Sequence, residues 1–175
     1  MKRYAVIFVF LVCLSLLAVS SVRASMVTYP SLGTYVEEAY DIIIGQVVAI
    51  ECKKGPTDEF AHIYVTIRIE KNLKKQLLSK EITICHYGNV IPPLKCGTTY
   101  DVYFESDQPV FKKNERVLIF ISPHTSRTDS YDIYGKVGGK YSVINNMVIN
   151  THMSINKSLD VFLAEIEGFL NEKKK

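Results

Sequence analysis

Residues 60–70 alternate apolar and polar side chains, a pattern that lets an extended strand bury one face and leave the other outside. The apolar face holds Ile63, Val65, Ile67 and Ile69. The opposite face holds His62, Tyr64, Thr66, Arg68 and Glu70, which we expect to meet solvent. The segment therefore predicts a half-buried β-strand, whose apolar face must be covered by other segments of the chain.

Further strands are predicted on both sides of this segment. Asp41 to Glu51 is apolar on both faces, as expected of a strand covered on both sides, and Gly45 within it indicates a bulge or bend. Asn114 precedes another strand and suits a left-handed turn, and Asn145-Asn146 predicts a tight hairpin. The remaining predicted strands cover residues 81–85, 100–104, 116–122, 131–134, 141–144 and 147–148.

Two helices are predicted at the ends of this strand-rich region. Ser31 is the expected N-cap of a short helix that reaches Ala39. A C-terminal helix over 158–170 starts with Ser158 as N-cap. Its apolar stripe, which we expect to dock on the strands, consists of Leu159, Phe162, Leu163, Ile166, Phe169 and Leu170.

Short antiparallel strands, a glycine kink and covering helices predict a mainly β fold, a small OB-like β-barrel with a short N-terminal helix and an amphipathic C-terminal helix. Residues 25–175 are long enough for one core and short for two, so they are predicted to form a single domain. Residues 87–98 hold two prolines and two glycines and predict a long loop.

The first 24 residues are predicted to be a signal peptide. Lys2 and Arg3 precede an uncharged, mostly apolar stretch, and Val22-Arg23-Ala24 fits a signal-peptidase site. We therefore expect an exported protein, secreted, periplasmic or on the cell surface. The alternative is an uncleaved membrane anchor, because residues 4–22 are long enough to span a bilayer.

Removal of this leader makes the chain neutral. The full chain has 21 Lys and Arg against 18 Asp and Glu, and residues 1–24 contain three basic residues and no acid, which leaves 18 of each. A nucleic-acid binder depends largely on neutralising phosphates, so we expect no nucleic acid among the partners.

The order of these segments resembles that of exported prokaryotic proteins of unknown role, a group similar to the OB-fold of the netrin module and of tissue inhibitors of metalloproteases. The segments that carry the resemblance are 31–39, 41–47, 60–70, 115–120 and 139–143. The resemblance implies the barrel, and it covers most of residues 31–170. Those inhibitors chelate zinc through an N-terminal cysteine, whereas this chain after cleavage starts at Ser25, so the resemblance implies no inhibition by that route.

Three cysteines remain after residue 24, namely Cys52, Cys85 and Cys96. In an oxidising compartment a disulfide is expected, and we pair Cys85 with Cys96 because the loop between them needs a clamp. Pairing of Cys52 with Cys85 is the second possibility, and three unbonded thiols are the third. Structural zinc needs four ligands at closer spacing, so no metal site is assigned.

No catalytic or cofactor-binding residue is assigned. Cys85 and His86 are neighbours on a predicted strand and point to opposite faces, which prevents them from sharing a proton. Residues 135–140 are rich in glycine and lysine but lack the spacing of a P-loop, so they predict a turn.

The pattern favours an exported, non-enzymatic binding module that needs no cofactor. Its partner is unknown, and the module is expected to be protein-binding or inhibitor-like. Its expected contacts lie in the loops, at Tyr87, Lys95, Tyr131, Tyr134 and Lys136. The tyrosines also suit the half-buried rim of a barrel. Two other functions stay open: a membrane-tethered envelope protein, and an enzyme that uses Cys85, His86 and His124.

Overall fold

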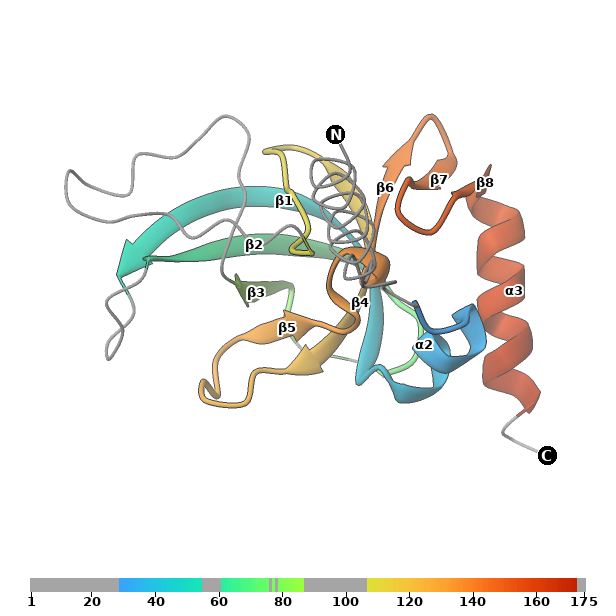
Figure 1. Ribbon diagram of the computed structural model, residues 1–175, viewed down its shortest axis with the longest axis horizontal. Helices are drawn as coiled ribbons and strands as arrows, with labels where there is room; N and C mark the ends of the chain where they lie inside the picture. Colours follow the sequence, from blue (N-terminus) through green and yellow to red (C-terminus); the bar gives the residue numbers. More distant parts are fainter. Residues whose placement is uncertain (1–28, 55–60, 76, 78, 87–106, 173–175) are drawn as a thin grey trace, which may run out of the picture.

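The computed structural model describes residues 29–54, 61–75, 77, 79–86 and 107–172. The described elements are α2 (Leu32–Glu38), β1 (Asp41–Lys54), β2 (Ala61–Asn72), β3 (Glu81–His86), β4 (Arg116–Pro123), β5 (Tyr131–Ile133), the 3₁₀ turn η2 (Lys136–Gly139), β6 (Lys140–Ile144), β7 (Met147–Asn150), β8 (Ile155–Ser158) and α3 (Leu159–Glu172) (Figure 1). The predicted strand at 100–104 and the loop at 87–98 lie outside the described residues.

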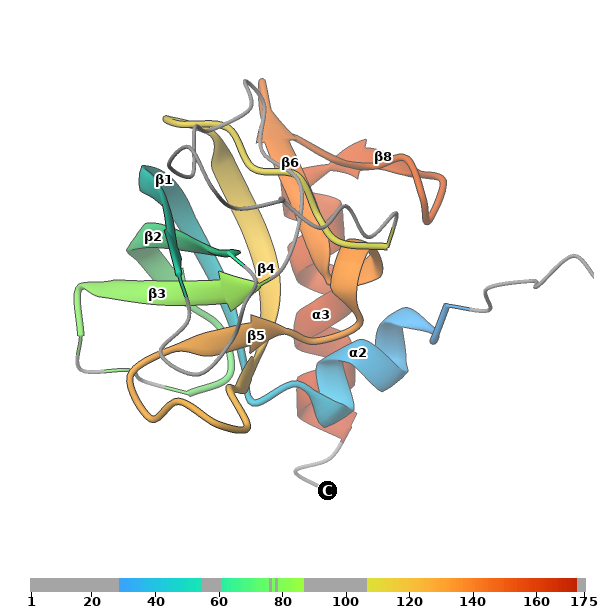
Figure 2. The same ribbon diagram turned by 60° about the vertical axis from the view of Figure 1, so that its left-hand side comes forward.

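Five strands close into a barrel in the order β1-β2-β3-β5-β4, and β1 pairs with β4 to complete the ring (Figure 2). All of these pairings are antiparallel except β3 with β5, which run parallel. This arrangement confirms the predicted mainly β fold with a small OB-like barrel.

Strand β1 is irregular at Gly45, where the sequence predicts a bulge or bend. Its register with β2 shifts between Ile44 and Gly45. A Cβ at Gly45 would lie 2.4 Å from the backbone oxygen of Arg68, so only glycine fits this close approach without a shift of backbone. The bend lets the first half of β1 pair with β2 and β4 together.

Apolar side chains form two cores, one on each side of the β1–β4 wall. The barrel interior contains Ile43, Val47, Ile63, Val65, Ile67, Ile82, Ile84, Phe111, Val117, Ile119, Ile121 and Ile133. The second core lies between the outside of that wall and the helices, and contains Tyr35, Val36, Ala39, Ile42, Ile44, Leu118, Phe120, Tyr141, Val143, Val148, Leu159, Phe162 and Ile166. This explains the unbroken apolar runs of β1 and β4, whose alternate residues enter different cores.

Strands β6, β7 and β8 extend the sheet beyond the barrel from β4. The β6–β7 hairpin turns at Asn145 and Asn146, with φ of 49° and 61°, which confirms the predicted turn. Strand β8 was not predicted, because Ile155-Asn156-Lys157-Ser158 has one apolar residue and obtains its strand form from pairing with β7.

The two predicted helices are confirmed and lie side by side over the second core (Figures 1 and 2). The Ser31 hydroxyl accepts the Thr34 amide at 3.2 Å, and the Ser158 hydroxyl accepts the Val161 amide at 3.3 Å. At the other end of α2 the ammonium of Lys74 donates to the carbonyls of Val36, Glu37 and Ala39. It thereby satisfies carbonyls that the helix end leaves without partners. In the part of the chain described here, no helix is both long and apolar enough to cross a membrane.

Candidate binding surface on β2, β3 and the β4–β5 loop

The outer face of β2 and β3 is the first surface to consider, because OB barrels bind their ligands there and on the adjoining loops. Thr66 of β2 is opposite Thr83 of β3, and Tyr64 is opposite Cys85. These side chains alternate with the inward Val65 and Ile84, so they face away from the barrel core.

The β4–β5 loop brings Arg127 onto this face. Its Nη1 donates to the phenol oxygen of Tyr64 and, at 3.2 Å, to the sulfur of Cys85. The Arg127 guanidinium carbon is 5.3 Å from the centre of the Tyr64 ring, and Lys53 Nζ is 5.7 Å from that centre. Two cations therefore flank one tyrosine. We call Lys53, Tyr64, Cys85 and Arg127 the Arg127 cluster.

Contacts within the loop hold Arg127 in position. The backbone amide of His124 donates to the Ser130 carbonyl at 3.2 Å, and the Ser126 amide donates to Nδ1 of His124 at the same distance. Nε2 of His124 lies 3.8 Å from the Asp132 carboxylate. Burial raises the pKa of Asp132, and His124 and Arg127 partly oppose this shift.

The cysteines correct one prediction. Cys85 is fully buried and takes no part in a disulfide, so the predicted Cys85–Cys96 bond is wrong, as is the alternative bond to Cys52. The physical reason is that its sulfur faces the outside of β3, where it contacts Arg127. Cys52 is disulfide-bonded, and Cys96 lies outside the described residues.

The two histidines on β2 and β3 are both buried, although His62 was expected on a solvent-exposed face. His62 is only 3% exposed, which contradicts its predicted exposure, and its Nδ1 lies 3.8 Å from the Cys85 sulfur. His86 points into the barrel, where its ring is 5.7 Å from that of Phe111. The predicted opposition of Cys85 and His86 is confirmed. The candidate catalytic set of Cys85, His86 and His124 is thus not brought together at one site.

The predicted loop contacts are engaged within the protein. Tyr131 packs near Tyr40, with ring centres 6.1 Å apart, and burial raises its pKa. The Tyr134 hydroxyl donates to Glu38, which raises the pKa of Tyr134, and Lys136 pairs with Asp107. Tyr87 and Lys95 lie outside the described residues.

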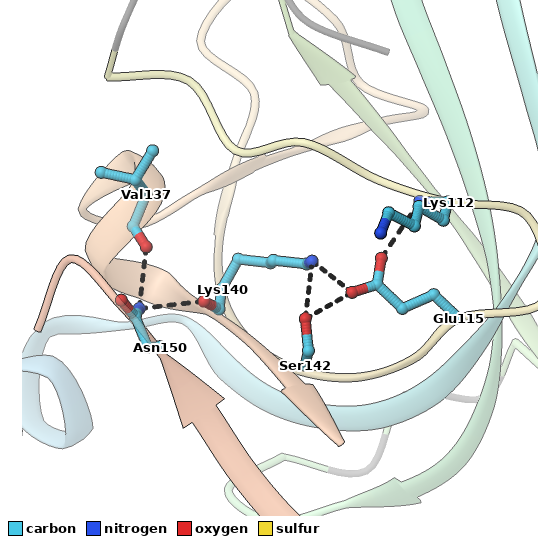
Figure 3. Close-up of polar contacts among 6 residues, drawn as sticks. All are labelled: Lys112, Glu115, Val137, Lys140, Ser142 and Asn150. Carbon is cyan, nitrogen blue, oxygen red and sulfur yellow. Dashed lines mark hydrogen bonds and ion pairs between the residues drawn. The ribbon is translucent and has the colours of Figure 1, made fainter. Parts of the chain in front are cut away.

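A second polar cluster lies where β6 meets the start of β4 (Figure 3). Lys140 donates to Glu115 at 2.5 Å and to the Ser142 hydroxyl at 3.1 Å, and the Ser142 hydroxyl donates to Glu115 at 2.5 Å. The Lys140 and Glu115 side chains are only 11% and 12% exposed. Burial lowers the pKa of Lys140, while Glu115 opposes the shift.

This cluster borders a cleft of about 370 Å³ that Gln108, Val110, Asn150 and His152 also line. A Ser–Lys pair becomes nucleophilic only when the lysine is neutral and can accept the serine proton. Here Glu115 favours the charged form of Lys140, and its carboxylate accepts the hydrogen bond of the Ser142 hydroxyl. The arrangement therefore suits a structural tie between β4 and β6 better than catalysis.

Asn150 fixes the turn that precedes this cluster. Its amide donates to the carbonyls of Val137 at 2.9 Å and Lys140 at 3.0 Å (Figure 3). Among the residues with described positions, no group of three His, Cys, Asp or Glu side chains could hold a metal ion.

Comparison with protein-family models and with curated proteins finds no match to this chain.

The sequence places Tyr64 on the outer face of its strand, but nothing in it connects Tyr64 with Arg127. No local pattern reports this contact, because the two residues are 63 positions apart. The signal that could have found it is the fold itself: in an OB barrel the loop after the fourth strand adjoins the outer face of the second and third.

Proposed function

We propose that this protein is an exported, non-enzymatic binding module whose partner is a protein. The predicted signal peptide supports export, and the disulfide-bonded Cys52 supports an oxidising compartment. The OB-like strand order supports the resemblance to the netrin-module group at the level of fold only.

The proposed contact surface is formed by Lys53, Tyr64 and Arg127 of the Arg127 cluster, beneath which Cys85 is buried. Arginine and tyrosine are the side chains most enriched at the energetic centres of protein interfaces, because they combine a large contact area with directed hydrogen bonds. Arg127 and Tyr64 are half-buried and hold each other in one geometry, so little further ordering is needed on binding. This pre-ordered pair on the outer face of the barrel is the observation that carries the proposal.

Site-specific photo-crosslinking in the native host tests the proposal. A photoreactive phenylalanine analogue at Thr66 or Thr83 would stand beside the cluster, whereas one at Asn156 on β8 would stand outside the barrel and serve as the control. We expect a discrete cross-linked protein from the first two positions and none from the third. Absence of a cross-link at both threonines, or an equal one at Asn156, contradicts the proposed surface.

A thiol-dependent activity is the second candidate, since Cys85 lies close to both His62 and Arg127. A cationic neighbour favours the reactive thiolate. Complete burial of Cys85 argues against a substrate reaching it. Rapid alkylation of Cys85 in the folded protein would favour this candidate over the binding module.

A membrane-tethered envelope protein is the remaining alternative, and the N-terminus of the protein recovered from its host decides it. An intact mass that starts at Ser25 supports an exported, untethered domain. A mass that retains residues 1–24 supports the tether instead.

A further inference from the structure

Arg127 differs from the other arginines in the described part of the chain. Arg68 pairs with Glu81 at 3.1 Å, and Arg116 pairs with Glu70 at 2.8 Å. Arg127 instead donates to the phenol oxygen of Tyr64 and to the sulfur of Cys85, and forms no ion pair with any carboxylate of the described residues. A half-buried guanidinium that contacts no carboxylate leaves much of the desolvation penalty of its charge uncompensated.

The Nε–H and Nη2–H groups of Arg127 are arranged so that they could bind a carboxylate. Both contacts of Arg127 use Nη1, and within the described residues Nε and Nη2 donate no hydrogen bond. A planar guanidinium receives a carboxylate through two parallel N–H groups. Asp132 is within electrostatic range, but its carboxylate lies beside His124 and does not contact Arg127.

From this geometry we infer that the partner presents an acidic side chain, aspartate or glutamate, to Arg127 beside the Tyr64 ring. The inference rests on the proposed function and names the chemistry recognised at the same surface. Lys53 adds a second positive charge next to Tyr64, although it also pairs with Glu51. The predicted mature domain is neutral overall, which favours a single acidic group on a protein over a polyanion.

The first test measures the cross-link from Thr66 in variants of two arginines on the same face. Arg127→Gln removes the proposed receptor, and Arg68→Gln is the matched control because Arg68 already holds Glu81. We expect the cross-linking yield to fall at least about tenfold with Arg127→Gln and to change less than about twofold with Arg68→Gln. An unchanged yield with Arg127→Gln overturns acid recognition but not the proposed binding surface, whereas absence of any cross-link in the wild type overturns the proposed surface itself.

The second test uses defined probes on the whole mature protein. Acetylated tetraglutamate, tetraglutamine and inorganic phosphate are titrated while the Arg127 Nε–H signal is followed by NMR. We expect tetraglutamate to shift it and tetraglutamine to leave it unchanged. Equal shifts from both peptides overturn the inference, and a shift from phosphate alone assigns the site to a phosphorylated ligand and overturns it as well.

A lysine variant separates charge from geometry. Arg127→Lys keeps the charge but loses the planar pair of donors, so it should restore only part of the cross-linking yield. Thermal unfolding of each variant shows whether the domain still folds. If Arg127→Gln does not fold, the shift from tetraglutamate in the wild-type protein decides the question.

Discussion

The phenol of Tyr35 lies directly against Gly138. A Cβ built on Gly138 would stand 2.1 Å from the Tyr35 hydroxyl oxygen. Tyr35 itself is completely buried, between α2 and the backbone of η2. The predicted glycine-rich turn at residues 135–140 therefore packs over the second core through Tyr35.

Substitution of Gly138 by alanine should destabilise the protein by about 2 kcal/mol, because the added methyl group must displace a packed ring. Gly168 on α3 is the matched control, since a Cβ there meets nothing within 4 Å. Gly168→Ala should stabilise the protein by about 0.5–1 kcal/mol through helix propensity. Chemical denaturation measures both changes, and equal effects of the two substitutions would contradict this packing.

Removal of the Tyr35 hydroxyl should stabilise the protein by about 1 kcal/mol at neutral pH, because that oxygen is buried without a hydrogen-bond partner. Burial raises the pKa of Tyr35 from 10.0 to about 12. As the pH rises, the Tyr35 phenol therefore ionises in the unfolded chain before it does so in the folded protein. The resulting contribution to the free energy of unfolding is fully present below pH 10 and is lost as the pH rises towards 12.

Tyr35→Phe should consequently flatten the alkaline decline. Between pH 10 and 11 the wild type should lose about 1 kcal/mol more than the variant. Denaturation midpoints at the two pH values test this difference. Parallel declines would show that Tyr35 ionises equally in both states.

Removal of one partner of the buried Lys140–Glu115 pair should destabilise the protein more than replacement of both partners. Glu115→Gln leaves a buried ammonium without its counter-charge and should cost about 3 kcal/mol. The double variant with Lys140→Met should recover much of that loss. Lys136→Met is the control, because its pair with Asp107 is exposed and should contribute less than about 1 kcal/mol. A double-mutant cycle by urea unfolding that gives no coupling would contradict this description.

Lys74 should stabilise the end of α2 through its three carbonyl contacts. Lys74→Met should cost about 1–2 kcal/mol and accelerate amide hydrogen exchange in α2. Lys75→Met is the matched control, since Lys75 contacts the Tyr40 ring instead. Unchanged exchange in α2 would show that the helix end does not depend on this ammonium.

Peptide mapping without reduction should find Cys52 in a disulfide and Cys85 as a thiol. Iodoacetamide should modify Cys85 only after denaturation, because its sulfur is fully buried. A linked peptide that contains Cys85 would contradict this assignment.

Local features of the sequence predicted most of the fold. The alternation of residues 60–70 and the asparagine pair of the β6–β7 turn depend on neighbouring residues, so they could be recognised in isolation. The burial of His62 and the ion pair of Lys140 with Glu115 depend on segments far apart in the chain. The Arg127 cluster likewise exists only once the barrel has closed, and for that reason its chemistry has no signature in the sequence.

The pairing of β1 with β4 has a consequence for when the protein can fold. Asp41 pairs with Ile121, so the barrel cannot close until a chain segment of 80 further positions is present. Pairings of such long range form slowly, because the loop between them loses conformational freedom first. For a chain exported in the proposed way, this delay would help to keep it unfolded until it has crossed the membrane.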